Sequence, residues 1–176
     1  MVVLRDMIKS DVDDYVRWFT TDVDWMKMDA PWESEISSVE DARKSWNEYY
    51  DSVSGAGSET VRWKYEIELD GRHIGWVSRY TYLEYLENPD GIPAVGIDIP
   101  ETDVHGKGVG TEALGQFIKY LGENGFRSFY TQTWSGNAAM LRLAEKLGFR
   151  EEIRKEGHRI VEGEAYDAIT LRLDLE

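Results

Sequence analysis

The chain has no cysteine and only three histidines among its 176 residues. Without cysteine it has no disulfide, no thiol nucleophile and no thiolate metal site, although this absence is compatible with either redox compartment. The histidines, His73, His105 and His158, are too far apart in the sequence to form a local metal-binding motif. We therefore predict no metal site.

Long apolar runs and positive charge are also scarce. No apolar stretch approaches the ~20 residues of a membrane-spanning helix, and the first residues lack the basic start and apolar run of a secretory signal. The formal net charge is −14. A chain this acidic offers no basic face to nucleic acid and favours cationic partners. The alternative is that the acidity serves only solubility. We expect a cytoplasmic protein with neither a membrane nor a nucleic-acid partner.

The rest of the composition suits one domain that spans residues 1–176. Apolar residues make up 41% of the chain, enough to build a core at this length. Alternating and helical patterns predict the element order β, α, α, β, β, β, α, β, α, β, β. The elements fall at about residues 2–4, 10–19, 39–52, 61–69, 73–82, 95–100, 111–121, 129–134, 137–147, 150–155 and 165–173. This order predicts an α/β domain with a mixed central sheet of about seven strands and about four helices.

The most informative segment is Val95–Pro100, followed by Glu101–Val104, the loop His105-Gly-Lys-Gly-Val-Gly110 and a helix from Thr111. A strand, a glycine-rich loop and a helix in this order leave free main-chain N–H groups at the positive end of a helix dipole, which favours a phosphate-bearing ligand. The dinucleotide motif fails because Thr111 stands where its third glycine belongs. The Walker motif fails because no Ser or Thr follows Gly106-Lys107.

The loop instead resembles the pyrophosphate loop of the GNAT N-acetyltransferase superfamily, Gln/Arg-x-x-Gly-x-Gly/Ala, with His105 in its first place. The resemblance implies that the co-substrate is acetyl-CoA and that main-chain amides of the loop bind its diphosphate. The cofactor-binding residues implied are Ile97, Ile99, His105, Gly106, Lys107, Gly108, Val109, Gly110, Thr111 and Asn137.

A second segment, Thr131–Phe149, is similar to the Asn-x-x-Ala…Glu-Lys-x-Gly-Phe block of the same family. In the family, the side chain at the Asn137 position contacts the cofactor. The alternative is that Asn137 only caps the helix, which Gly148 would end in a left-handed conformation. The tail pattern from Gly157 to Asp167 resembles the branch that acetylates ribosomal proteins and polyamines, whereas Gly96-Ile-Asp98 resembles the aminoglycoside acetyltransferases.

Acetyl transfer to an amine needs a base for the ammonium proton, a polarised thioester and a proton for the thiolate. Asp98 is the candidate catalytic base, or else it only anchors a cationic substrate. Many family members carry a tyrosine as acid where this chain has Ala144. Tyr130, Tyr166 or water could replace it.

The acidic aromatic segment between Thr20 and Ser37 is our candidate for amine recognition. Its substrate-binding residues would be Trp25, Asp29, Trp32 and Glu33. The tryptophans could equally be core residues.

The resemblance therefore implies an N-acetyltransferase acting on a primary amine of a small cationic molecule. The alternatives are an enzyme that acetylates protein N-termini and a non-catalytic acyl-CoA sensor. A small-amine enzyme should show a closed acidic pocket formed by residues 20–37 and 83–93. Relatives often form dimers, so a homodimer is a further expectation.

Overall fold

The computed structural model describes residues 1–33, 35–57, 59–88 and 90–176. Seven strands are present: β1 (Val2–Arg5), β2 (Lys64–Leu69), β3 (Arg72–Tyr80), β4 (Ala94–Asp98), β5 (Ser128–Trp134), β6 (Arg150–Val161) and β7 (Glu164–Asp174). The helices are α1 (Asp11–Thr20), α2 (Val39–Val53), α3 (Val109–Glu123) and α4 (Ala138–Lys146), with short 3-10 helices η1 (Asp24–Lys27) and η2 (Thr102–Val104). The predicted order of strands and helices is confirmed.

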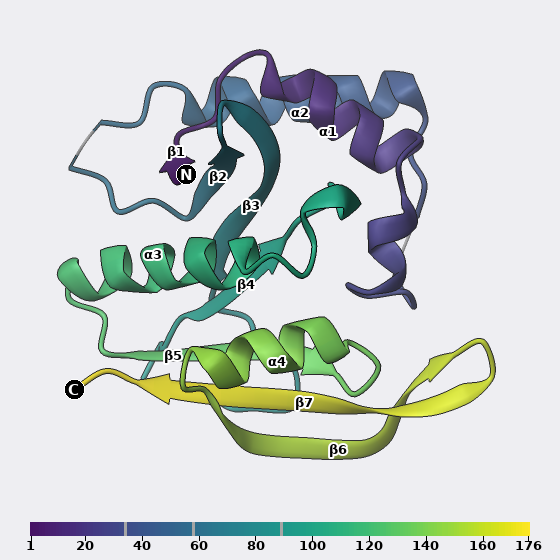
Figure 1. Ribbon diagram of the computed structural model, residues 1–176, viewed down its shortest axis with the longest axis vertical. Helices are drawn as coiled ribbons and strands as arrows, with labels where there is room; N and C mark the ends of the chain where they lie inside the picture. Colours follow the sequence, from purple (N-terminus) through teal and green to yellow (C-terminus); the bar gives the residue numbers. More distant parts are fainter. Residues whose placement is uncertain (34, 58, 89) are drawn as a thin grey trace.

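The strands form one mixed sheet in the order β1-β2-β3-β4-β5-β7-β6. All neighbouring pairs are antiparallel except β4 and β5, which are parallel. Figure 1 shows α3 and α4 on one face of the sheet and α1 with α2 near the β1–β3 end. The predicted fold class, a mixed α/β sheet with four helices, is confirmed.

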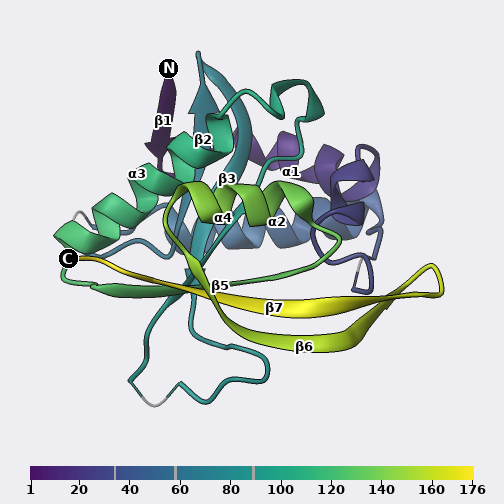
Figure 2. The same cartoon turned by 60° about the horizontal axis from the view of Figure 1, so that its bottom comes forward.

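Each face of the sheet has its own apolar core. Under α3 and α4, residues such as Val77, Val95 and Phe117 are completely buried. Under α1 and α2, an aromatic core forms around Tyr15 and Trp18, with Tyr15 stacked on Trp46 at 3.8 Å between ring centroids. The two cores hold the helices on opposite faces, as Figure 2 shows.

The centre of the sheet opens between β4 and β5. These strands pair only at Ala94 and Tyr130, where the Tyr130 N–H donates to the Pro93 carbonyl at 3.0 Å. Beyond this pair the two halves of the sheet diverge, and Figure 2 shows β2 and β3 running steeply across the direction of β5, β6 and β7. The divergence exposes the end of β4 on the side that faces β5.

The turn between β2 and β3 and the start of β3 fix the position of β4. Asp70 and Gly71 both have positive φ (50° and 84°), as the predicted two-residue hairpin turn requires. Three residues into β3, a Cβ atom on Gly75 would lie 2.1 Å from the main-chain oxygen of Asp98. Glycine is therefore required for β3 to approach the end of β4 this closely.

Two predicted strand boundaries and one segment predicted to be irregular differ from the structure. Strand β2 begins at Lys64 rather than Val61, and β6 continues to Val161 rather than ending near Lys155, because its mostly exposed residues carry no apolar alternation. The segment from Thr20 to Ser37, predicted to be irregular, contains η1. Ser34 and Pro89, within the two segments expected to form the pocket, lie outside the described residues.

Candidate active site

A cavity of about 670 Å³ lies where β4 and β5 separate. One end, here called the donor end, is bounded by the loop before α3 and by α4. The other, the acceptor end, is bounded by η1 with the residues after it, by β3 and by Arg159 of β6. Predicted site residues on the wall are Trp25, Asp29, Trp32, Glu33, Ile97, Asp98, Ile99, His105, Gly106, Gly108, Val109, Gly110, Thr111 and Asn137. Lys107 is not on the cavity wall, and its side chain is exposed.

The glycine-rich loop presents main-chain N–H groups at the start of α3. Gly106 and Gly108 have positive φ (73° and 83°), and Gly108 is the N-cap of the helix. Within the described ranges, no main-chain carbonyl accepts a hydrogen bond from the N–H groups of residues 106–111. Free N–H groups at the positive end of a helix dipole fit a diphosphate.

The His105 side chain ties this loop to the end of β4. Its Nε2 lies 2.7 Å from the Ile99 carbonyl oxygen, and because a carbonyl only accepts, Nε2 must carry the proton. His105 therefore holds its own loop, which is a role that the sequence pattern did not indicate. Val109 is largely buried in the core, so its contribution to the site is its main-chain N–H.

Asn137 is the N-cap of α4, as the capping alternative predicted. Its Oδ1 accepts a hydrogen bond from the Met140 N–H at 3.0 Å, while the residue also lines the cavity. On the same wall, Arg142 and Lys146 stand one helical turn apart, and both are cations that suit a polyphosphate. Sequence reasoning missed this pair, although their i, i+4 spacing on α4 was visible.

At the acceptor end, Asp29 and Asp98 both line the cavity. Burial raises the pKa of Asp98 well above 3.8, and the charge of Asp29 adds to this rise, against the opposing charge of Lys64. Burial and then the charge of Glu33 also raise the pKa of Asp29. The charge of one carboxylate in the cavity therefore disfavours ionisation of the other.

The aromatic residues of the acceptor end have different roles. Trp25 is a core residue, 9% exposed, whose Nε1 donates to the Trp18 carbonyl at 3.0 Å. Trp32 instead faces the guanidinium of Arg159, 4.1 Å from its ring centroid. Arg159 also donates to Glu84 at 2.6 Å, so it joins β6 to the segment after η1 and to the segment after β3. Glu33 is exposed at the rim.

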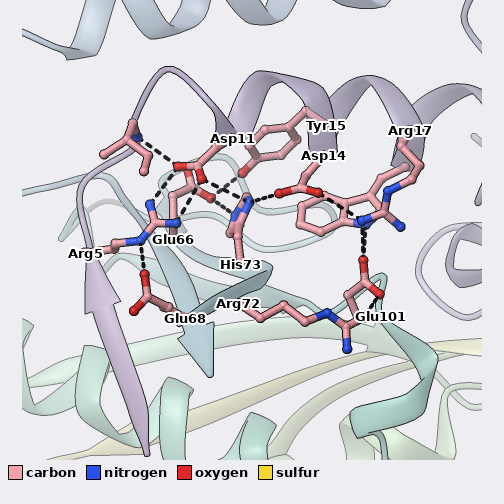
Figure 3. A network of polar contacts seen from close by, with 12 residues as sticks. Arg5, Asp11, Asp14, Tyr15, Arg17, Glu66, Glu68, Arg72, His73 and Glu101 are labelled. Atoms are coloured by element: carbon pink, nitrogen blue, oxygen red, sulfur yellow. Dashed lines mark hydrogen bonds and ion pairs between the residues drawn. The ribbon is translucent and has the colours of Figure 1, made fainter. Parts of the chain in front are cut away.

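A buried polar network positions the elements behind the cavity (Figure 3). Its centre is His73, whose ring lies 3.0 Å from Glu66 and 3.1 Å from Asp14. Burial lowers the pKa of His73, but these hydrogen bonds outweigh it and raise the pKa to about 9. Tyr15 donates to Glu66 at 2.6 Å. The network joins α1 to β2 and β3.

The same network offers three potential metal ligands, Asp11, Asp14 and His73. Spacing in the sequence had not revealed this group, because it depends on carboxylates brought in by α1. Asp11 already pairs with Arg5 through two hydrogen bonds of 2.7 and 2.9 Å, and His73 holds its proton at neutral pH. Arg5 and the proton on His73 compete with a metal ion for these ligand atoms, so we assign the group to structural pairing.

A second part of the network fixes the start of the glycine-rich loop. Glu101, 8% exposed, accepts hydrogen bonds from Arg17 at 2.5 Å, from the Trp18 indole at 2.8 Å and from Arg72. It immediately precedes η2, which leads into the loop. Helix α1 and strand β3 therefore anchor the chain just before the proposed phosphate site.

The chain is similar to a known protein family and to several solved structures. The acetyltransferase (GNAT) domain family matches residues 2–150. The chain belongs to the GNAT acetyltransferase family. Members of this family take acetyl-CoA as the acetyl donor, in agreement with the resemblance of the glycine-rich loop. No curated protein sequence matches the chain significantly.

Solved GNAT structures agree with this fold over the full chain. A protein assigned as a phosphinothricin N-acetyltransferase is 26% identical, with coverage of 100% and 99% of the two chains and a TM-score of 0.72. An acetyltransferase from Salmonella typhimurium, solved with acetyl-CoA, is 18% identical, with coverage of 100% and 95% and a TM-score of 0.72. A ribosomal-protein-alanine N-acetyltransferase from Brucella melitensis is 16% identical, with coverage of 98% and 99% and a TM-score of 0.70.

The tyrosines of this GNAT enzyme lie differently from our expectation. Ala144 is completely buried in the core. The Tyr130 hydroxyl lies 3.3 Å from Arg172, Tyr166 packs against Trp134, and neither tyrosine lines the cavity. Tyr80, which sequence reasoning missed, does line it. Burial raises the pKa of Tyr80 to about 12, so its phenol stays protonated at neutral pH.

No helix among the described residues is long and apolar enough to cross a membrane.

Proposed function

We propose that this GNAT acetyltransferase transfers the acetyl group of acetyl-CoA to a primary amine of a small cationic molecule. The observation that carries the proposal is that two acidic residues, Asp29 and Asp98, line the same cavity as the glycine-rich loop. A pair that holds one proton keeps one negative charge. That charge attracts an ammonium group and can then accept its proton.

The donor end would hold the diphosphate of acetyl-CoA on the main-chain N–H groups of residues 106–111, with Arg142 and Lys146 as neutralising cations. Main-chain groups of β4 at Ile97 and Ile99 would align the thioester, since β4 has no partner strand on this side beyond Ala94. The donor would then end beside Asp98. This arrangement brings the amine and the acetyl carbonyl together.

Proton transfer completes the reaction in this proposal. The Asp29–Asp98 pair takes a proton from the ammonium group, and the neutral amine attacks the acetyl carbonyl. As the amide forms, the C–S bond breaks, the thiolate receives a proton, and the nitrogen loses its second proton, which replaces the one given to the thiolate. Tyr80 is the proposed proton donor to the thiolate, because its protonated phenol lines the cavity and interacts with both carboxylates.

Two observations favour a small acceptor over a protein N-terminus. Arg159 joins Glu84 and Trp32 across the acceptor end, which narrows the path that a peptide would need. The tail pattern that resembles the ribosomal-protein branch has a structural role, since Asp167 accepts a hydrogen bond from the Gly157 N–H at 2.9 Å. The Gly157 and Asp167 positions of that pattern therefore support the β6–β7 hairpin.

A screen of thiol release from acetyl-CoA tests the proposal. The panel holds polyamines, aminoglycosides, amino acids with phosphinothricin among them, and peptides with free N-termini. We expect saturable turnover with a small amine and acetyl-CoA binding by calorimetry. Turnover with peptides alone would establish the N-terminal alternative, and binding without turnover on the whole panel would establish the sensor.

A cytoplasmic location and a homodimer are further parts of this proposal. The sheet leaves β6 as an edge strand, and an edge can pair with a second copy. Sedimentation at several protein concentrations tests the dimer, and cell fractionation tests the location.

A further inference from the structure

Residues 28–33, here called the acceptor wall, follow η1 and form one side of the acceptor end of the cavity. The members that line the cavity are Met28, Asp29, Ala30, Trp32 and Glu33. The acceptor wall consists of turns and irregular chain, so hydrogen bonds of a helix or a sheet do not hold its shape. Its position must therefore come from contacts with other parts of the protein.

Trp134, the last residue of β5, supplies such a contact. Its Nε1 lies 3.0 Å from the carbonyl oxygen of Met28 and 3.0 Å from that of Asp29, so one indole N–H donates to two carbonyl groups. Trp134 is 5% exposed, and water therefore replaces this donor poorly. Loss of the N–H would leave two carbonyl groups short of a partner.

Two aromatic rings fix the orientation of the Trp134 indole. Tyr166 of β7 meets it edge to face, with 4.9 Å between ring centroids and 87° between ring planes. Trp32 of the acceptor wall meets it at 5.7 Å and 88°. Aromatic pairs favour such perpendicular arrangements. Because Trp32 also faces the guanidinium of Arg159, the acceptor wall is attached to both β5 and β6.

The turn after β5 leaves room for this indole. A Cβ atom on Gly136 would lie 1.9 Å from Cζ3 of Trp134 and 2.3 Å from its Cη2, so a larger residue there would displace the ring. The Asn137 N–H donates to the Trp134 carbonyl at 3.0 Å, which turns the chain into α4. This second contact is made by the main chain, and a change of the Trp134 side chain leaves both of its groups in place.

We propose that Trp134 is a positioning residue that fixes the main chain at Met28 and Asp29 and thereby sets the affinity of the enzyme for its acceptor amine. The inference rests on the proposed function, in which the carboxylate of Asp29 attracts the ammonium group. Trp134 is not on the cavity wall, so it acts through the residues that it holds. Its indole contacts the acceptor wall, whereas the N–H groups proposed to bind acetyl-CoA belong to the loop before α3.

Hydrogen–deuterium exchange of the whole protein, followed by mass spectrometry, tests the attachment without an acceptor. The N–H groups of Met28 and Asp29 donate to the Trp25 carbonyl, so their exchange reports local opening of the acceptor wall. Trp134→Phe removes the indole N–H and keeps an aromatic ring. We expect the peptide with residues 24–33 to exchange roughly fivefold faster or more, and peptides from α3 to keep the wild-type rate.

Trp63→Phe is the matched control. Trp63 is 52% exposed and lies off the cavity wall, so this change should leave the exchange of residues 24–33 at the wild-type rate. A folded Trp134→Phe protein with wild-type exchange over these residues overturns the proposal. If Trp134→Phe does not fold, Trp134→benzothienylalanine decides, because sulfur replaces the N–H and the shape of the ring is kept. Unchanged exchange in that variant also overturns the proposal.

Steady-state kinetics test the consequence for the acceptor that the thiol-release screen finds. Trp134→Phe should raise KM for the acceptor roughly fivefold or more with little change in kcat. The dissociation constant of acetyl-CoA, measured by calorimetry, should stay near wild type. General structural damage would instead change kcat and acetyl-CoA binding together with KM, and that result would overturn the proposal, as would faster exchange with an unchanged KM.

The two measurements separate this inference from the proposed function. If the wild-type protein turns over no amine of the panel, the proposed function is refuted, and with it the role of Trp134 in acceptor affinity. The exchange experiment then still decides whether Trp134 holds the acceptor wall. If the wild type turns over a small amine and Trp134→Phe matches it in exchange and in KM, only the inference on Trp134 fails.

Discussion

Asp29 and Asp98 both line the acceptor end of the cavity, and the charge of Asp29 raises the pKa of Asp98. One residue follows η1 and the other ends β4, so only the folded chain brings them together. Because burial and the charge of a neighbouring carboxylate raise the pKa of both groups, the pair can hold a proton and a negative charge together.

Asp98→Asn should lower kcat/KM for acetyl transfer about 10²- to 10⁴-fold, since it removes the carboxylate that accepts the proton. Affinity for acetyl-CoA should stay near wild type, because the glycine-rich loop is unchanged. Kinetics with the acceptor found by the screen and calorimetry with acetyl-CoA measure the two effects. Glu123→Gln, an exposed change on α3, is the control. Wild-type turnover in Asp98→Asn would refute the role of the pair.

Gly108→Ala should weaken the binding of acetyl-CoA. The residue has a φ of 83°, and a side chain there costs about 1–2 kcal/mol. Without ligand, the loop of the variant relaxes to another conformation and releases this strain. Binding must restore the original conformation, so the dissociation constant should rise roughly 5- to 30-fold. Gly55→Ala is the matched control, since that glycine has open space around it and no positive φ. Equal affinities of the two variants, measured by calorimetry, would contradict the role of the loop.

Gly75→Ala should destabilise the protein and displace Asp98. The added Cβ would lie 2.1 Å from the Asp98 carbonyl oxygen, so β3 and β4 must separate. Such overpacking costs roughly 1–3 kcal/mol of unfolding free energy, which urea denaturation measures. Gly57→Ala, with nothing near its Cβ position, should unfold at the wild-type urea concentration. Wild-type stability in both variants would show that the strands tolerate the separation.

Stability should fall as the pH rises from about 6.5 through 9, because His73 loses its proton. Its pKa in the folded protein is about 9, above the ordinary value of 6.5. The stabilisation from the protonated ring is therefore complete below pH 6.5 and lost above pH 9, a change of roughly 3 kcal/mol.

Urea denaturation at pH 6, 7.5 and 9 tests this dependence. His73→Gln should be less stable at pH 6 and should show a flatter pH profile than wild type. His158→Gln, at an exposed position, should keep the wild-type slope. A His73→Gln protein that retains the full slope would assign the dependence to other groups.

The element order and the conformation of the glycine-rich loop were predictable because both depend on local pattern. Asp70-Gly71 indicates a hairpin turn, and Gly106 and Gly108 have the positive φ values that glycine adopts most readily. The position of Asn137 before an apolar helical stripe likewise predicted the cap on α4. In each case, residues close in the sequence determine the conformation.

The parts that sequence missed depend on partners far along the chain. The polar residues Lys64 and Glu66 alternate with apolar ones, a pattern typical of a strand with one face in water, yet Glu66 is 1% exposed. This face of β2 can be buried because Tyr15 and His73 supply hydrogen bonds to Glu66. Tyr80 lies on the cavity wall because of the pairing register of β3, and Arg159 lies there because the β6–β7 hairpin is long enough to reach it. No local spacing encodes these contacts.

Because β4 and β5 are joined at a single residue pair, the sheet has a seam, a line with few hydrogen bonds, through its middle. An extended molecule lying in that seam would act as an additional, non-covalent strand and would connect the two halves of the sheet. The donor would then serve as a structural component as well as a reactant, and loss of the spent coenzyme would loosen the protein at its centre.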